Sequence, residues 1–119
     1  MTLETIEKLA LKQKWATKDY KPSWDSTLYR IGDKIFIFVM HDDKNPMMNF
    51  KNDPFINIHL REKYPDITAA YHMNKKHWNT LFYKDSKINV NFLEQIIRES
   101  YEIVLNSLPK NKRRLLETS

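Results

Sequence analysis

The sequence predicts an α+β protein in the order α-βββ-α-ββ-α, with a five-stranded antiparallel sheet covered by helices. Apolar residues recur at helical spacing near both ends of the chain and indicate the outer helices. Two β-rich runs are joined by Gly32 and Asp33, and no long crossover separates the first three strands, so neighbouring strands should pair antiparallel. We expect residues 1–108 to form one domain and residues 109–119 to be a frayed basic tail.

The amino-terminal segment predicts a helix over residues 2–13, because Leu3, Ile6 and Leu9 recur at helical spacing. Residues 14–25 follow neither a helical nor a strand period and contain a proline, so we expect a connecting loop there. Three aromatic side chains are expected to pin this loop to the core: Trp15, Tyr20 and Trp24.

Residues 27–31 and 34–40 predict two strands joined by a tight turn. Gly32 stands at the first position of that turn, where a positive φ is needed, and glycine adopts this conformation without steric cost. A polar turn is expected over residues 41–46, and residues 47–51 predict a third strand.

Asp53 and Pro54 begin the second predicted helix, which runs to about Lys63. Asp is a favoured N-cap because its carboxylate accepts backbone N–H groups, and Pro is preorganised for the first helical position. Two short strands are expected after this helix, over residues 70–73 and 77–83, with a polar turn between them.

The last helix is predicted to begin with Asn91 and Glu94, which resemble a capping box, and to end before Pro109. Its apolar residues form one stripe: Phe92, Leu93, Ile96, Ile97, Tyr101, Val104, Leu105 and Leu108. We expect this stripe to face the sheet.

Composition excludes several classes of function. The 119 residues contain no Cys, which excludes disulfides, thiolate zinc sites, iron–sulfur clusters and cysteine nucleophiles. The single Gly excludes dinucleotide-binding fingerprints, phosphate loops and nucleophile elbows, which need several glycines. No apolar run approaches the about 20 residues that span a bilayer. We expect a cytoplasmic protein, a monomer by default, with no cofactor, no metal and no membrane contact.

The charge of the chain is unevenly distributed. The 20 Lys and Arg against 15 Asp and Glu give a net charge of +5 with His neutral. Residues 71–88 carry +3, from four lysines against one aspartate, and residues 109–119 carry +3, from four basic residues against one glutamate. Clustered positive charge attracts phosphates, although a surplus of this size is also common in proteins that bind no nucleic acid.

The densest group of polar and aromatic residues lies between positions 71 and 80. In nucleic-acid binding, lysines meet phosphates, Asn and His meet base edges or sugars, and aromatic rings stack on exposed bases. This hypothesis assigns phosphate or base contacts to Asn74, Lys75, Lys76 and His77, and ligand or stacking contacts to Tyr71, His72 and Trp78. The alternative is a buried Trp beside a solvated hairpin tip whose Asn residues form the turn.

The C-terminal segment supplies a second group of candidate phosphate contacts: Lys110, Lys112, Arg113 and Arg114. Basic residues after a helix also favour the helix dipole and solubility, so both interpretations stay open. No serine lies in a motif that would hold a nucleophile against a base, and the four histidines lack the spacing of a zinc site. The sequence therefore predicts no catalytic residue.

Several segments, in order, resemble the YjbR/MmcQ family: Lys34-Ile35-Phe36, residues 51–54, Leu60-Arg61-Glu62, residues 71–80 and residues 100–109. The stretch His77-Trp78-Asn79-Thr80 is the most specific of them. The resemblance implies a small α+β fold, similar to type III secretion chaperones and related to wing-like DNA-binding domains. It also implies DNA binding, the usual label of the family, and no established catalytic residues.

Together these observations favour a non-enzymatic bacterial protein that contacts DNA through the second hairpin and the basic tail. The alternative is a protein-interaction module that uses a sheet edge or an exposed apolar patch. A third hypothesis, a small-molecule enzyme, would need a pocket lined by His72, His77 and a carboxylate.

Overall fold

The computed structural model describes residues 1–70 and 73–118. The elements along this part of the chain are α1 (Leu3–Leu11), β1 (Thr17–Lys21), the 3-10 helix η1 (Pro22–Trp24), β2 (Ser26–Ile31), β3 (Lys34–Met40), β4 (Met47–Lys51), α2 (Pro54–Lys63), β5 (Ile67–Ala69), β6 (Trp78–Phe82), α3 (Val90–Ser107) and α4 (Lys110–Glu117). The strands form one antiparallel sheet in the order β1-β2-β3-β4-β6-β5. The predicted α+β class with an antiparallel sheet is confirmed.

The β2–β3 hairpin forms where the sequence predicts it. Ile31 and Lys34 pair on either side of a two-residue turn. Gly32 has a φ of 64° at the first turn position, as expected. A side chain there would strain the backbone, so the single glycine of the chain is used where the hairpin needs it.

Side-chain caps define where α2 and α3 begin. Asp53 Oδ1 accepts the backbone N–H of Phe55 at 2.9 Å, which confirms the predicted start of α2. In α3 the cap is Asn89, whose Oδ1 accepts the N–H of Phe92 at 2.8 Å. The predicted cap, Asn91, instead lies inside the first turn of α3.

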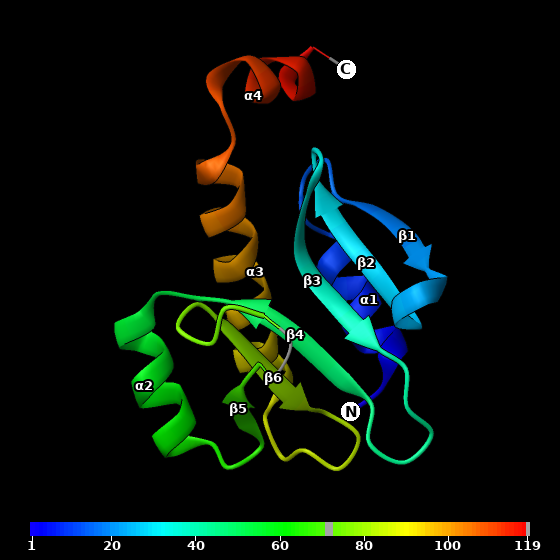
Figure 1. Ribbon diagram of the computed structural model, residues 1–119, viewed down its shortest axis with the longest axis vertical. Helices are drawn as coiled ribbons and strands as arrows, with labels where there is room; N and C mark the ends of the chain where they lie inside the picture. Colours follow the sequence, from blue (N-terminus) through cyan, green and yellow to red (C-terminus); the bar gives the residue numbers. More distant parts are fainter. Residues whose placement is uncertain (71–72, 119) are drawn as a thin grey trace.

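Helices α1, α2 and α3 lie on one face of the sheet, as Figure 1 shows for α1 and α3 behind the strands. The core between these layers contains large buried side chains from both: Ile6, Leu9, Tyr29, Phe36, Ile37, Met48, Phe50, Leu60, Leu81, Leu93, Ile97 and Tyr101. Within residues 1–70 and 73–118, no helix has both the length and the apolar character needed to cross a bilayer.

The opposite face of the sheet carries a smaller buried cluster: Leu28, Phe38, Ala70 and Trp78. Short segments of the chain cover this cluster. The Trp24 ring, from η1, lies 5.8 Å from the Phe38 ring between centroids, and Met73 packs against the cluster from the segment before β6. This face is therefore less covered than the face under the helices.

The prediction of five strands, with a loop over residues 14–25, was wrong. Thr17–Lys21 form an additional edge strand, β1, which pairs along its length with β2. Four of its five residues are exposed, so the sequence lacks the alternation that marks a half-buried strand, and backbone pairing supplies the order instead. Of the aromatics expected to pin a loop, Trp15 does pack against the main core, whereas Tyr20 is 52% exposed.

The short strand expected over residues 70–73 lies earlier, at Ile67–Ala69. Ile67 pairs with Leu81 of β6 and is buried in the core, which fixes the register at this position. Positions 71 and 72 of the expected strand lie outside the described residues.

The C-terminal segment, expected as a frayed tail, is the helix α4. Leu116 packs against the main core, and Lys112 Nζ lies 2.5 Å from Asp33 Oδ2 at the tip of the β2–β3 hairpin. These two contacts give the segment a docking position that composition alone does not indicate.

Candidate nucleic-acid interface

A tight turn precedes β6. Asn74 Oδ1 accepts the backbone N–H of Lys76 at 3.0 Å, and the Asn74 carbonyl oxygen accepts the N–H groups of His77 and Trp78 at 3.2 and 2.9 Å. Asn74 therefore acts as a turn former. The turn leaves the side chains of Lys75 and Lys76 exposed and His77 half-buried.

Arg61 of α2 holds this turn in place. Its Nη2 donates to the carbonyl oxygens of Lys75 and Trp78, at 2.6 and 3.1 Å, and its Nε donates to Asn79 Oδ1 at 2.9 Å. In the described ranges no carboxylate forms an ion pair with Arg61. Burial lowers the pKa of the Arg61 guanidinium, which nevertheless remains protonated near neutral pH. Its positive charge therefore adds to that of the turn.

Asn57 supports the same turn from inside the protein. Its Nδ2 donates to the carbonyl oxygens of Asn52 and Lys76, at 3.1 and 2.8 Å, and its Oδ1 accepts from Asn79 Nδ2 at 2.7 Å. Among the residues that the structure describes, no buried side-chain nitrogen or oxygen lacks a hydrogen-bond partner. Because a buried amide without partners is costly, these bonds fix the backbone under Lys75 and Lys76.

Lys51 brings a further cation to this end of the sheet. It pairs with Trp78 across β4 and β6, and its backbone N–H donates to Ser100 Oγ at 2.8 Å. Glu99 lies in the same region and accepts a hydrogen bond from Asn52 Nδ2 at 3.1 Å. The basic turn, which we define as Lys51, Arg61, Lys75 and Lys76, thus gathers four cations from three separate segments.

The aromatic candidates differ in what they offer a ligand. Trp78 is buried, with its ring centroid 5.7 Å from that of Phe38, so it belongs to the packing of the sheet. Tyr71 and His72 lie outside the described residues. Within the described ranges, no group of three His, Cys, Asp or Glu residues gathers in a way that suits a metal ion.

The C-terminal candidates lie away from the basic turn. Figure 1 places α4 beyond the end of α3, next to the hairpin tip, whereas the segment before β6 lies beside α2. Lys112 pairs with Asp33. Lys110 and Arg114 are exposed and Arg113 is half-buried. The structure therefore separates the two basic segments that the sequence grouped into one contact.

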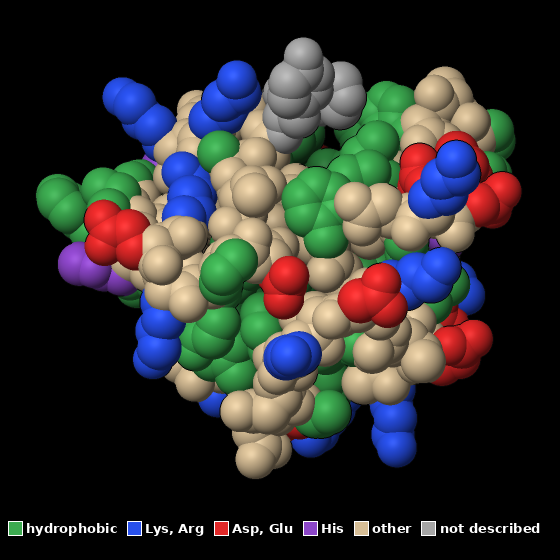
Figure 2. Space-filling view, turned by 90° about the horizontal axis from the view of Figure 1, so that it is seen from below, with side chains coloured by type: hydrophobic (Ala, Val, Ile, Leu, Met, Phe, Trp, Pro, Cys, Tyr) green, Lys and Arg blue, Asp and Glu red, His purple; other side chains and the backbone are tan. Residues whose placement is uncertain are grey.

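The first half of α2 exposes three large apolar side chains. Phe55 is 78% exposed, Ile58 53% and Ile56 44%, whereas Asn57 on the inner side has no exposed surface. Figure 2 shows hydrophobic side chains gathered where α2 protrudes from the molecule. This helix therefore buries Leu60 and an amide on its inner side and exposes three large apolar side chains, which an ordinary surface helix does not.

Sequence reasoning missed the residues that support the turn: Asn52, Asn57, Arg61 and Asn79. A signal existed in α2, where Asn57 stands between Ile56 and Ile58. Apolar periodicity alone assigns such an Asn to the solvent side. Only the turn, with carbonyl groups in need of donors, explains why the amide faces inward.

A comparison with known protein families shows which family this chain belongs to. The model of the YjbR family matches residues 9–103. The chain belongs to the YjbR family. The match with each of two relatives from Escherichia coli covers nearly the whole length of both chains. The uncharacterised protein YjbR of strain K12 is 27% identical over 116 residues, 98% of both chains, and the uncharacterised protein YbdF of O157:H7 is 31% identical over 111 residues, 93% of this chain and 90% of the relative.

Solved structures of similar proteins have the same fold. The crystal structure of Deinococcus radiodurans protein DR2400, described as a DUF419 domain, superposes with a TM-score of 0.86 at 21% identity and covers 98% of this chain and 88% of its own. A crystal structure of a Pseudomonas syringae protein gives a TM-score of 0.75 at 24% identity, covering 87% and 99%. At these identities the likeness concerns the fold.

Proposed function

We propose that this YjbR-family chain is a non-enzymatic nucleic-acid-binding protein whose phosphate contacts come from the basic turn. The observation that carries the proposal is the fixed backbone of residues 75–78, whose carbonyl groups accept hydrogen bonds from Arg61 and Asn57. Lys75 and Lys76 therefore extend from a preformed loop, and binding a phosphate does not require ordering of that loop.

The charge arrangement supports the same proposal. Lys51 pairs with Trp78 next to the turn, and Arg61 donates to carbonyl oxygens of the turn, so both add positive charge to that of the two exposed lysines at this end of the sheet. Each neutralised phosphate releases bound counterions, which makes the binding salt-dependent. Lys110, Arg113 and Arg114 form a second basic surface on α4, which only a longer nucleic acid reaches together with the turn.

Fluorescence anisotropy of labelled DNA tests the proposal, with the full chain titrated at about 50 and 200 mM salt. The variant Lys75→Glu with Lys76→Glu is compared with Lys84→Glu with Lys87→Glu, which changes the net charge equally at two exposed lysines outside the turn. We expect the first variant to lose about tenfold or more in affinity and to show a weaker salt dependence, with a smaller loss in the second. Equal losses in both variants, or no binding by the unmodified chain at low salt, contradict the proposal.

A second candidate, a protein-interaction module, is favoured by the exposed apolar side chains of α2. Exposed apolar patches on soluble proteins commonly mark contact surfaces. Sedimentation velocity of the chain and of a variant with Phe55→Ser and Ile58→Ser tests whether a second copy binds there. A dimer that the variant abolishes supports this use of α2, and a monomer in both samples excludes it.

A further inference from the structure

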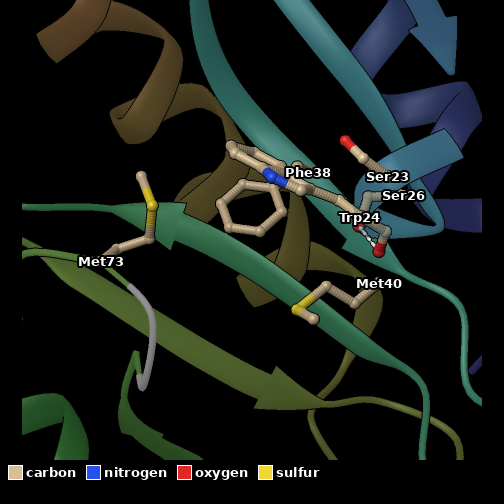
Figure 3. A pocket seen from close by; sticks show the side chains of 6 residues that line it. All are labelled: Ser23, Trp24, Ser26, Phe38, Met40 and Met73. Carbon is tan, nitrogen blue, oxygen red and sulfur yellow. Dashed lines mark hydrogen bonds between the residues drawn. The ribbon is translucent and has the colours of Figure 1, made fainter. Parts of the chain in front are cut away.

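The less covered face of the sheet contains an apolar pocket of about 370 Å³, which the basic turn does not use. Figure 3 shows its lining, which comes from η1, the two strands after it and the segment before β6: Ser23, Trp24, Ser26, Phe38, Met40 and Met73. Pockets of this size and character usually accommodate small ligands or single groups of larger ones.

The lining suits a flat aromatic ring. Phe38 is buried between the other side chains, and the Trp24 ring lies 5.8 Å from it, with an angle of 51° between the ring planes. In Figure 3, Met73 and Met40 lie on opposite sides of Phe38. Aromatic faces and thioether sulfurs both make favourable contacts with an inserted ring.

The turn that presents Trp24 is strained and firmly held. Asp25 has a φ of 45°, which is unfavourable for a residue with a side chain. Tyr20 Oη donates to Asp25 Oδ1 at 2.6 Å, and the Asp25 carbonyl oxygen accepts the N–H of His41 at 3.0 Å. Non-glycine residues kept in such conformations cluster at functional sites. These hydrogen bonds hold the turn that follows Trp24, whose side chain lines the pocket and is 39% exposed.

One cation contacts a lining residue of the pocket, and two more follow another lining residue closely in the sequence. Lys21 Nζ lies 3.9 Å from the centroid of the Trp24 ring. Met73 also lines the pocket, and in the sequence it is followed after one residue by Lys75 and Lys76 of the basic turn. A ligand that fits this arrangement carries a flat ring with negative charges on both sides of it.

We infer that the pocket receives an unpaired base of a single-stranded nucleic acid, whose phosphates contact Lys21 on one side and Lys75 and Lys76 on the other. This inference rests on the proposed function and specifies its ligand. Double-stranded DNA keeps its bases stacked and paired, so it cannot place one in the pocket without flipping it out. A single-stranded nucleic acid, whose bases are already unpaired, places a base in the pocket at little cost in free energy.

The test compares three labelled probes of about 12 nucleotides, a length within the range of single-strand sites. These are a thymine strand, the same backbone with abasic residues, and a duplex. We expect the thymine strand to bind about tenfold more tightly than the abasic strand and more tightly than the duplex. Trp24→Ala should remove the preference for bases, and Trp24→Phe should retain most of it, with thermal unfolding confirming that both variants fold.

Each other outcome has a distinct meaning. Equal, salt-dependent binding of the thymine and abasic strands, still weakened by Lys75→Glu with Lys76→Glu, overturns the pocket inference and leaves the proposed function intact. Tighter binding of the duplex also overturns the inference. If thymidine monophosphate competes at concentrations similar to those of the thymine strand, the assignment of the pocket to a single-stranded nucleic acid is overturned. Absence of binding by all three probes contradicts the proposed function itself.

Discussion

The side chains of Asn57 and Asn79 form a hydrogen bond of 2.7 Å at a place where neither residue has any exposed surface. One residue lies on α2 and the other on β6, so this bond connects a helix to the strand that follows the basic turn. The register of that turn relative to α2 therefore depends on an amide pair inside the protein.

Asn57→Leu should lower the free energy of unfolding by about 3 kcal/mol, because it leaves the Asn79 amide and the Lys76 carbonyl without a partner in a buried place. Urea unfolding followed by circular dichroism measures the change. Asn106→Leu, at an exposed position of α3, is the matched control and should change the value by about 0.5 kcal/mol or less. An unchanged urea midpoint for Asn57→Leu would show that the buried amide network does not stabilise the fold.

Arg61→Met should loosen the basic turn without unfolding the protein. The substitution removes the donors to the carbonyl oxygens of Lys75 and Trp78. The amide of Trp78, which donates to the Asn74 carbonyl, should then exchange its hydrogen about tenfold faster. Hydrogen exchange measured by NMR tests this, with Arg98→Met as the exposed control. The idea fails if Trp78 exchanges at the same rate in both variants.

Ser100→Ala should destabilise the protein by about 2 kcal/mol. The buried Ser100 hydroxyl donates to the Phe36 carbonyl oxygen at 2.6 Å and accepts the N–H of Lys51 at 2.8 Å, so it joins α3 to two strands. Ser107→Ala serves as the comparison, since the Ser107 hydroxyl donates to the Val104 carbonyl oxygen within the same helix. Similar thermal midpoints for the two variants would argue against this bridging role.

Stability should fall in acid partly through Glu7. Hydrogen bonds from Lys18, and secondarily from Tyr29, hold the pKa of the Glu7 carboxyl below its ordinary value of 4.5. The unfolded chain therefore binds this proton more readily, so the stabilisation is complete above pH 4.5 and is lost as the pH falls through the lower folded value. Urea unfolding measured at pH 4.5 and at decreasing pH below it should show a free energy of unfolding that depends less steeply on pH for Glu7→Gln than for Glu62→Gln. Identical pH profiles would exclude a contribution from Glu7.

Local chemistry made the hairpin and α2 predictable. Gly32 in a two-residue turn and the Asp53-Pro54 start are signals that act within a few residues, and both were correct. The strand β1 was not predictable in this way, because its residues Thr17–Lys21 are mostly exposed and the strand owes its order to the neighbouring β2. Helix α4 likewise depends on Leu116 and on the ion pair with Asp33.

The candidate site was predictable only in part. Lys75 and Lys76 are evident from charge, but the inward orientation of Asn57 and Arg61 depends on carbonyl groups 19 and 14 residues away in the chain. The pocket was missed altogether, because Trp24 and Met73 come from segments without a regular period. Contacts between distant segments carry no local pattern in one sequence.

The strand order also divides the sheet into two units that should open separately. β1, β2, β3 and β4 follow one another through short connections and form the first unit, whereas β5 and β6, the second unit, join the sheet only after the chain has passed through α2. We expect the first unit to close early during folding, with α3 packing on β2, β3 and β4, and the second unit to join later. Lys21 belongs to the first unit, and Lys75 lies three residues before β6 of the second. A single-stranded nucleic acid bound to both lysines would therefore connect the two units of the sheet and slow their separation.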